Sequence, residues 1–230
     1  MKHLFLSIAL LLSTCAFVNA QCYNSDVSKC CGVTTIGECP VKGCRGDSNL
    51  NRRKNITAIP DPAIVEDWAF NDMLFVLFPE SWTRGAERTL LTEWGEGKAI
   101  RLKVRLKKAK GSGHETPNCH LKLQANNDFH LVLTRVKNKP EEESITAEIT
   151  PRLRPEGWKL SKLNQLASIQ AYVRITGYLM LDTEHLGDSV PKRFTHWEIH
   201  PVTAFEVCTL TKAECDDGDG WVDLEDVPES

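Results

Sequence analysis

After its first 20 residues, the sequence has no apolar run long enough to cross a membrane, and neither sign of charge dominates. A membrane-spanning helix needs about 20 mostly apolar residues, so we expect no membrane insertion. The formal net charge is −3 at pH 7, which does not indicate nonspecific binding to nucleic acid or to anionic membranes. Internal repeats and low-complexity tracts are also missing, which argues against a repeat protein.

The first 20 residues have the pattern of a secretory signal peptide. A short basic start is followed by an apolar stretch at residues 4–12, and the small residues Val18 and Ala20 stand at positions −3 and −1. This pattern is typical of a segment that is cleaved during export. We therefore predict a secreted, extracellular protein whose mature chain begins at Gln21.

Eight cysteines follow the predicted signal peptide, and an even number in an exported chain predicts disulfide bonds. Five lie within residues 22–44 and three lie further along, so complete pairing requires at least one bridge between the two groups. Residues 21–55 are therefore expected to form a Cys-rich cap attached to the main domain. Zinc is the weaker interpretation, because the spacing is irregular and no histidine lies nearby. The eight are Cys22, Cys30, Cys31, Cys39, Cys44, Cys119, Cys208 and Cys215, and the sequence does not decide their connectivity.

Residues 98–208 predict a mainly β domain. In "KAIRLKVRLKKAK", apolar and basic side chains alternate strictly, which is typical of a half-buried strand. Further strands are expected at residues 129–136, 144–150, 172–182 and 193–208, with a helix at residues 157–170. Three strands, a helix and two strands is the element order of the OB fold, so we predict a five-stranded OB-like barrel. The glycine in "ITGYL" suits a bend or bulge in that barrel.

The segments that flank the barrel are expected to be different in character. Residues 56–97 form a helical and loop lead-in, with a helix from about Pro62 to just before Pro79. Residues 209–230 form an acidic C-terminal tail. Asn55 begins an Asn-Ile-Thr triplet, which predicts N-glycosylation if the host is eukaryotic.

Several motifs resemble an uncharacterised family of exported, mostly bacterial proteins. They are "GDSNLNRRKN", "ETPNCH", "DFHLVL", "EITPRLRPEGW", "VRITGYLMLDTEH" and "WEIHPVT", which together cover roughly residues 43–207. The resemblance implies an OB-like barrel. It implies no catalytic residue, because no activity is associated with that family.

Polar side chains fall on the predicted outer face of several strands. In a strand, residues two apart share a face, so "HWEIH" places His196, Glu198 and His200 together. Imidazole and carboxylate groups suit zinc or manganese, and they also suit acid–base chemistry. The candidate metal ligands are His185, His196 and His200, and the candidate acid–base residues are His130, Glu148, Asp182 and Glu198. The alternative is a solvated sheet face with ordinary cross-strand pairs.

Two more charged segments are candidate binding sites. Arg101, Lys103, Arg105 and Lys107 form a basic stripe that could bind a polyanion, or could simply be the solvated side of a strand. The segment "CDDGDGWVDLED" resembles a calcium loop, although cysteine replaces the first aspartate and only four residues follow it. Its candidate calcium ligands are Asp217, Asp219, Asp223 and Asp226.

Three functional hypotheses follow from these patterns. The leading one is a disulfide-stabilised extracellular binding protein whose polar barrel face takes a metal ion or an anionic ligand. The second is a metal-assisted hydrolase of the phosphodiesterase or nuclease kind. The third is a structural protein of the extracellular matrix or of a biomineral, with a calcium-binding tail.

Overall fold

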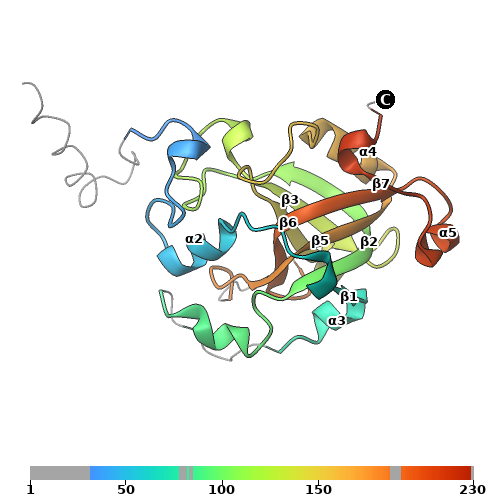
Figure 1. Cartoon of the computed structure of the whole chain (residues 1–230), viewed down its shortest axis with the longest axis horizontal. Helices are drawn as coiled ribbons and strands as arrows, with labels where there is room; N and C mark the ends of the chain where they lie inside the picture. Colours follow the sequence, from blue (N-terminus) through green and yellow to red (C-terminus); the bar gives the residue numbers. More distant parts are fainter. Residues whose placement is uncertain (1–31, 78–81, 83–84, 187–192, 229–230) are drawn as a thin grey trace, which may run out of the picture.

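A closed five-stranded barrel forms the centre of the molecule (Figure 1). The computed structural model describes residues 32–77, 82, 85–186 and 193–228, so Cys22, Cys30, Cys31 and the predicted signal peptide lie outside the described residues. The barrel strands are β2 (Ala99–Gly111), β3 (Phe129–Thr134), β4 (Ile145–Ile149), β5 (Tyr172–Leu181) and β6 (Trp197–Cys208).

The strand order is that of an OB-like barrel, as the element pattern predicted. The strands follow the order β2-β3-β4-β6-β5, and β5 pairs again with β2 to close the barrel. The β4–β6 pair is parallel, and the other pairs of the barrel are antiparallel. Helix α4 (Leu160–Ser168) connects β4 to β5 and packs against β2.

The barrel interior is filled by the alternating apolar residues of its strands. On β2, Ile100, Leu102, Val104 and Leu106 are all fully buried, as their alternation predicted. A bulge between Leu106 and Lys108 then shifts the alternation by one residue. The glycine of "ITGYL" also lies at an irregularity, because the β5–β6 register shifts on both sides of Gly177.

The lead-in does not contain the continuous helix predicted from Pro62. It contains a short 3₁₀ helix, a strand and a five-residue helix instead: η2 (Pro62–Ile64), β1 (Glu66–Trp68) and α3 (Phe70–Leu74). The first half of β2 lies beyond the reach of β3, and β1 pairs with it in parallel there. A tertiary contact with the edge of β2 has therefore overridden the local helical preference. The remaining 3₁₀ helices of the described chain before β6 are η1 (Ile36–Glu38), η3 (Arg88–Thr92), η4 (Gln124–Asn126) and η5 (Glu141–Glu143).

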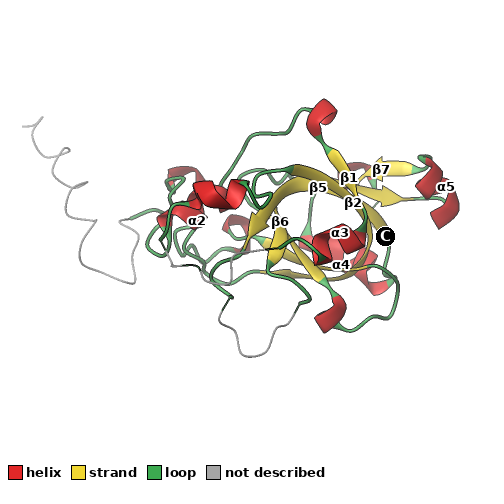
Figure 2. Ribbon diagram, turned by 90° about the horizontal axis from the view of Figure 1, so that it is seen from below, coloured by secondary structure: helices red, strands yellow, loops and turns green. Residues whose placement is uncertain are grey.

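The Cys-rich segment is attached to the barrel, as cysteine parity predicted. A disulfide joins Cys39 to Cys119, and Cys44 is also disulfide-bonded. Arg152 adds a second attachment, because its guanidinium donates to Asn55 Oδ1 and to the carbonyl of Cys39. Helix α2 (Ser48–Lys54) belongs to this cap and contacts β6. Figures 1 and 2 both place α2 on the side of the barrel away from α5.

The predicted glycosylation of Asn55 conflicts with the fold. The Asn55 side chain is buried, and its amide nitrogen donates to the carbonyl oxygens of Val41 and Pro117 at 2.9 Å each. A glycan attached to this nitrogen would break both hydrogen bonds and would have to pass through the attached cap.

The acidic C-terminal segment is folded against the barrel. It contains α5 (Lys212–Asp217), β7 (Trp221–Asp223), which pairs with the end of β6, and η6 (Leu224–Asp226). A second disulfide joins Cys208 to Cys215. Among the described residues, no helix has the length and apolar character needed to cross a membrane.

Candidate functional site

Strand pairing brings most of the predicted polar residues into one cluster. His130 on β3 stands opposite Glu148 on β4, and the His130 Nε2 atom is 3.3 Å from Glu148 Oε1. Glu198 on β6 stands opposite Thr146, two residues before Glu148 on the same face of β4. The alternation of side chains could predict the face. It could not predict this register.

His200 lies at the centre of the cluster. Its Nδ1 atom is 2.9 Å from Glu148 Oε2 and 3.3 Å from Glu198 Oε1, and only the contact with Glu198 has the alignment of a hydrogen bond. On the other side of the ring, Nε2 is 3.7 Å from Asp128 Oδ2. Asn118 donates to the other oxygen of Asp128 at 3.0 Å.

Asp182, at the end of β5, is joined to the cluster by an arginine. Arg193 forms an ion pair with Asp182 and a second one with Glu198, in which Nη1 is 2.8 Å from Oε2. The backbone N–H of Asp182 donates to the carbonyl of His196. Asp182 therefore has a structural partner for its charge.

Sequence reasoning missed four charged members of this cluster. They are Lys54, Glu115, Asp128 and Arg193. Only Asp128 carried a signal, because it lies two residues before His130 and extends the same alternation. Lys54 comes from α2, and its Nζ atom is 3.8 Å from Glu148 Oε2. That contact depends on how the cap folds over the barrel, which no local pattern reveals.

The cluster is buried, whereas the alternation predicted a solvated outer face. Glu148, Asp182, Glu198 and His200 are almost fully inaccessible. These side chains point away from the barrel interior, and the cap and the loop attached to it reach the cluster at two points: Lys54 of α2 contacts Glu148, and Asn118, next to Cys119, donates to Asp128. The Cys39–Cys119 disulfide joins the cap to this loop.

Burial and the neighbouring charges shift the pKa values in opposite directions. Burial alone would lower the pKa of His200, but attraction to Glu148 outweighs it and raises that pKa to about 10. The pKa of His130 rises to about 9 for the same reasons. Burial would raise the pKa of Glu148, but His130 and Lys54 hold it well below its ordinary value. Burial raises the pKa of Asp128 to about 6.

Two overlapping groups in the cluster have the composition of a metal site. One consists of Asp128, Glu148 and His200, and the other of Glu115, His130 and Glu148. Within each group, one ligand atom from every residue lies within 4.8 Å of the others. Among the described residues, His200 Nε2 and Glu148 Oε2 are buried without a hydrogen-bond partner. Buried polar atoms without a hydrogen bond are costly, and here only ion-pair contacts offset that cost: Nε2 lies 3.7 Å from Asp128 Oδ2, and Oε2 lies 2.9 Å from His200 Nδ1.

Two predicted metal ligands lie outside these groups. His185 has a largely exposed side chain, whose Nε2 atom is 3.9 Å from Asp182 Oδ2. His196 precedes β6, and it belongs to neither group of converging ligand atoms among the described residues. His196 and His185 are therefore not brought to the centre of the cluster, contrary to the prediction.

The four tail carboxylates do not form the predicted calcium loop. Asp217 ends α5, Gly218 caps that helix in a left-handed conformation, and Asp223 belongs to β7 and caps η6. A helix end and a strand thus replace the continuous loop. None of Asp217, Asp219, Asp223 and Asp226 belongs to a converging ligand group in the described chain.

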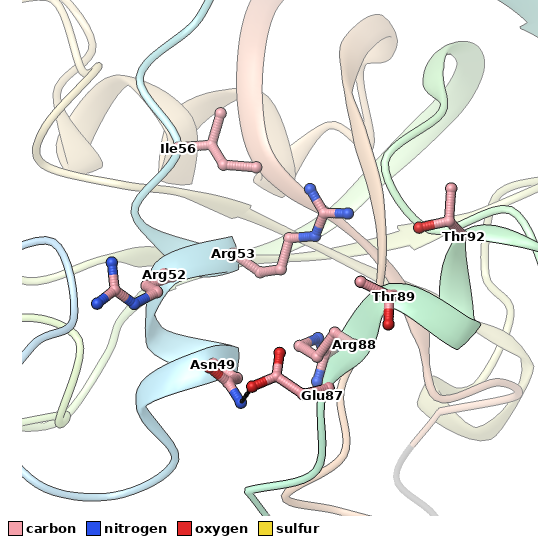
Figure 3. A pocket seen from close by; sticks show the side chains of 8 residues that line it. All are labelled: Asn49, Arg52, Arg53, Ile56, Glu87, Arg88, Thr89 and Thr92. Carbon is pink, nitrogen blue, oxygen red and sulfur yellow. Dashed lines mark hydrogen bonds between the residues drawn. The ribbon is translucent and has the colours of Figure 1, made fainter.

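A separate cleft of about 280 Å³ lies between α2 and η3 (Figure 3). Arg53 and Arg88 line it, but both guanidinium groups contact the buried carboxylate of Glu96. Asn49 at its edge donates to Glu87. Glu96 and Glu87 together offset two of the three positive charges of Arg52, Arg53 and Arg88, so the cleft keeps only a small excess of positive charge.

Comparisons with models of known protein families, with curated proteins and with solved structures found no match to this chain. The resemblance to a family of exported bacterial proteins therefore stays a prediction. The barrel itself follows from the strand pairing described above.

Proposed function

We propose that this protein is an extracellular binding protein that holds one divalent metal ion, zinc or manganese, in the buried cluster. The ligands would be Asp128, Glu148 and His200. The observation that carries the proposal is the convergence of three buried ligand atoms, one each from Asp128, Glu148 and His200. Imidazole nitrogen and carboxylate oxygen are ligands for both ions.

The charges of the cluster are compatible with a divalent ion. Four of its side chains are basic when both histidines are protonated, and five are acidic: Lys54, His130, Arg193 and His200 against Glu115, Asp128, Glu148, Asp182 and Glu198. A bound divalent ion requires neutral imidazole at its ligands. His200 is the one histidine among the proposed ligands, so a divalent ion that displaced its proton would change the formal charge of the cluster from −1 to 0.

The burial of the cluster favours binding over catalysis. A hydrolytic metal site keeps one coordination position open for water or substrate. Here the three proposed ligands are inaccessible, and no cluster residue lines either of the two clefts described. The hydrolase hypothesis therefore gains no support. The extracellular part of the proposal is supported by two disulfides, which are typical of oxidising compartments.

Calorimetric titration of metal-stripped protein with Zn²⁺ and with Mn²⁺, at about pH 7.5, tests the proposal. We expect one site per chain, and a loss of affinity of at least about tenfold in His200→Gln and in Asp128→Asn. His114→Gln is the matched control, because His114 is exposed and its side chain has no role in the cluster. Near-UV circular dichroism shows whether each variant is folded.

Two results would contradict the proposal. One is folded wild-type protein that takes up neither ion. The other is binding that His114→Gln weakens as much as His200→Gln does, because the ion would then bind to surface histidines.

A further inference from the structure

A second, larger cleft is lined by residues of β1, α3, β2, β5 and α5. Figure 2 shows α5 at the end of the molecule away from α2. Its volume is about 840 Å³, which is within the range of small-molecule sites. Its charged lining is predominantly basic, with one carboxylate, Asp67. The basic residues are Arg101, Lys103, Arg135, Arg174 and Lys212.

Ion pairs fix three of these cations in position, and one of the three is the pair of Lys212 with Asp216 on α5. Arg101 forms a bidentate pair with Asp67, with Nε–Oδ1 and Nη2–Oδ2 distances of 2.6 and 2.8 Å. Arg174 pairs with Glu206 on the neighbouring strand. Such pairs reduce the loss of side-chain freedom when a ligand binds.

Two other cations in the cleft have no carboxylate partner among the described residues. Lys103 Nζ donates to the carbonyl oxygens of Cys215 and Asp216, at the end of α5. Arg135 is exposed, and its guanidinium has no ion pair or hydrogen bond within the described chain. The cleft therefore presents uncompensated positive charge next to fixed guanidinium groups.

Aromatic rings support the cations in this region. Arg174 lies 4.8 Å from the ring centroid of Trp221, and both Arg105 and Lys212 lie 4.8 Å from that of Tyr172. The Tyr172 and Trp221 rings also contact each other, with their centroids 5.6 Å apart. These rings are already engaged, so they are not free platforms for nucleobases, which proteins bind largely by stacking.

We propose that this cleft binds a sulfated oligosaccharide. Sulfate groups would contact Arg135 and Lys103, which line the cleft and have no carboxylate partner among the described residues. The disulfides favour an oxidising environment, which is where sulfated sugars occur. The basic stripe predicted from the sequence contributes Arg101 and Lys103 to the lining. Arg105, which lies over the Tyr172 ring, and Lys107, which lies at the bulge, do not line the cleft.

Calorimetry with a fully sulfated heparin tetrasaccharide, at about 50 and about 150 mM NaCl, tests this proposal. The comparison ligands are the chemically desulfated tetrasaccharide, inorganic phosphate and a short single-stranded DNA. We expect binding of the sulfated sugar alone at the higher salt concentration. We expect Arg135→Ala to lose about tenfold in affinity. The slope of log affinity against log salt concentration should also be smaller by about one, because one fewer counterion is released.

Lys122→Ala is the control, because Lys122 is exposed and does not line the cleft. It should bind the sulfated sugar like the wild type. An equal loss in Lys122→Ala and Arg135→Ala would overturn the proposal, and so would tighter binding of DNA or phosphate. Asp128→Asn, which tests the metal site, should keep its affinity for the sugar, so the two proposals can fail separately.

Discussion

His200 and Glu148 lie on neighbouring parallel strands, with the Nδ1 atom of His200 2.9 Å from the Oε2 atom of Glu148 and both side chains buried. If either group lost its charge, the other would be a buried and unpaired charge. The folded protein would then be less stable, because neither group can be hydrated in place. The protonation state of this pair therefore couples the folding of the cap over the barrel to pH.

We predict that metal-free protein becomes less stable as the pH rises from about 7 to about 10. The Glu148 carboxylate raises the pKa of His200 from 6.5 to about 10, and Glu148 and Glu115 raise that of His130 from 6.5 to about 9. A raised folded-state pKa stabilises the fold while the group is protonated, and this contribution is lost as the pH passes through that pKa. The loss should be on the order of a few kcal/mol, measured by urea denaturation.

The control for this pH dependence is His114→Gln, which should follow the wild-type curve. His200→Gln should flatten the curve between these pH values, because the imidazolium is no longer there to titrate. An alkaline curve that is already flat in the wild-type protein would contradict the ion-pair geometry. In saturating Zn²⁺ the trend should reverse, since metal binding releases protons and strengthens with pH.

Lys54→Met should be strongly destabilising. The Lys54 ammonium is buried against Glu148, and the surrounding carboxylates raise its pKa well above the ordinary value despite the opposing effect of burial. Removal of one partner of a buried ion pair leaves an uncompensated charge and costs about 3–5 kcal/mol. Lys122→Met, at an exposed position, should change the free energy of unfolding by less than about 0.5 kcal/mol. Equal effects of the two substitutions would show that Lys54 is not a member of the cluster.

The barrel was predictable from the sequence because each strand carries its own signal. The alternation on β2 depends on local spacing, so it identified the apolar face of that strand. The helix between β4 and β5 is also a local signal, and its position among the strands identified the OB-like element order. The polar cluster was only half predictable. The faces of His130, Glu148, Glu198 and His200 follow from alternation, but their burial depends on a disulfide between residues 80 apart and on Lys54.

The errors have the same physical origin. The predicted helix after Pro62 gave way to a strand because β2 offers a free edge there, and a tertiary pairing cannot be read from local spacing. The calcium-like spacing in the tail was overridden by the Cys208–Cys215 disulfide and by pairing of β7 with β6. Both errors concern segments whose structure is decided by contacts distant in sequence.

Gly177→Ala should destabilise the barrel by about 1–3 kcal/mol. A methyl group at this position would lie 2.4 Å from the carbonyl oxygen of Pro201 and 2.5 Å from a side-chain carbon of Ile199, both on β6. Backbone atoms on a paired strand cannot move aside cheaply. Gly113→Ala is the matched control, because nothing lies within 4 Å of the added methyl group. The thermal midpoint of Gly177→Ala should be clearly lower than that of Gly113→Ala. Similar midpoints would contradict the close approach of Gly177 to β6 at the irregularity between the two strands.

The two disulfides whose cysteines are both described should contribute unequally to stability. Cys39 and Cys119 are 80 residues apart, whereas Cys208 and Cys215 are seven apart. Since cross-links that close longer loops restrict the unfolded chain more, we expect losses of about 4.5 and about 2.4 kcal/mol for the two double alanine variants. Urea denaturation measures both losses. A larger loss of stability in the Cys208→Ala/Cys215→Ala variant would contradict the prediction that the bridge to the cap restrains the unfolded chain more.

The same pair of variants separates the effect of the cap on the buried cluster from its effect on stability. Loss of the Cys39–Cys119 bridge should let water reach the cluster, because the residues before Cys119 contribute Glu115 to His130 and Asn118 to Asp128. Their pKa values should then move back from about 9 and about 10 towards the ordinary 6.5, which NMR titration of the imidazole resonances can follow. The Cys208→Ala/Cys215→Ala variant should leave both pKa values raised. If the pKa values of the two histidines fall as far in the Cys208→Ala/Cys215→Ala variant as in the Cys39→Ala/Cys119→Ala variant, the barrel as a whole, and not the cap, controls the access of water to His200.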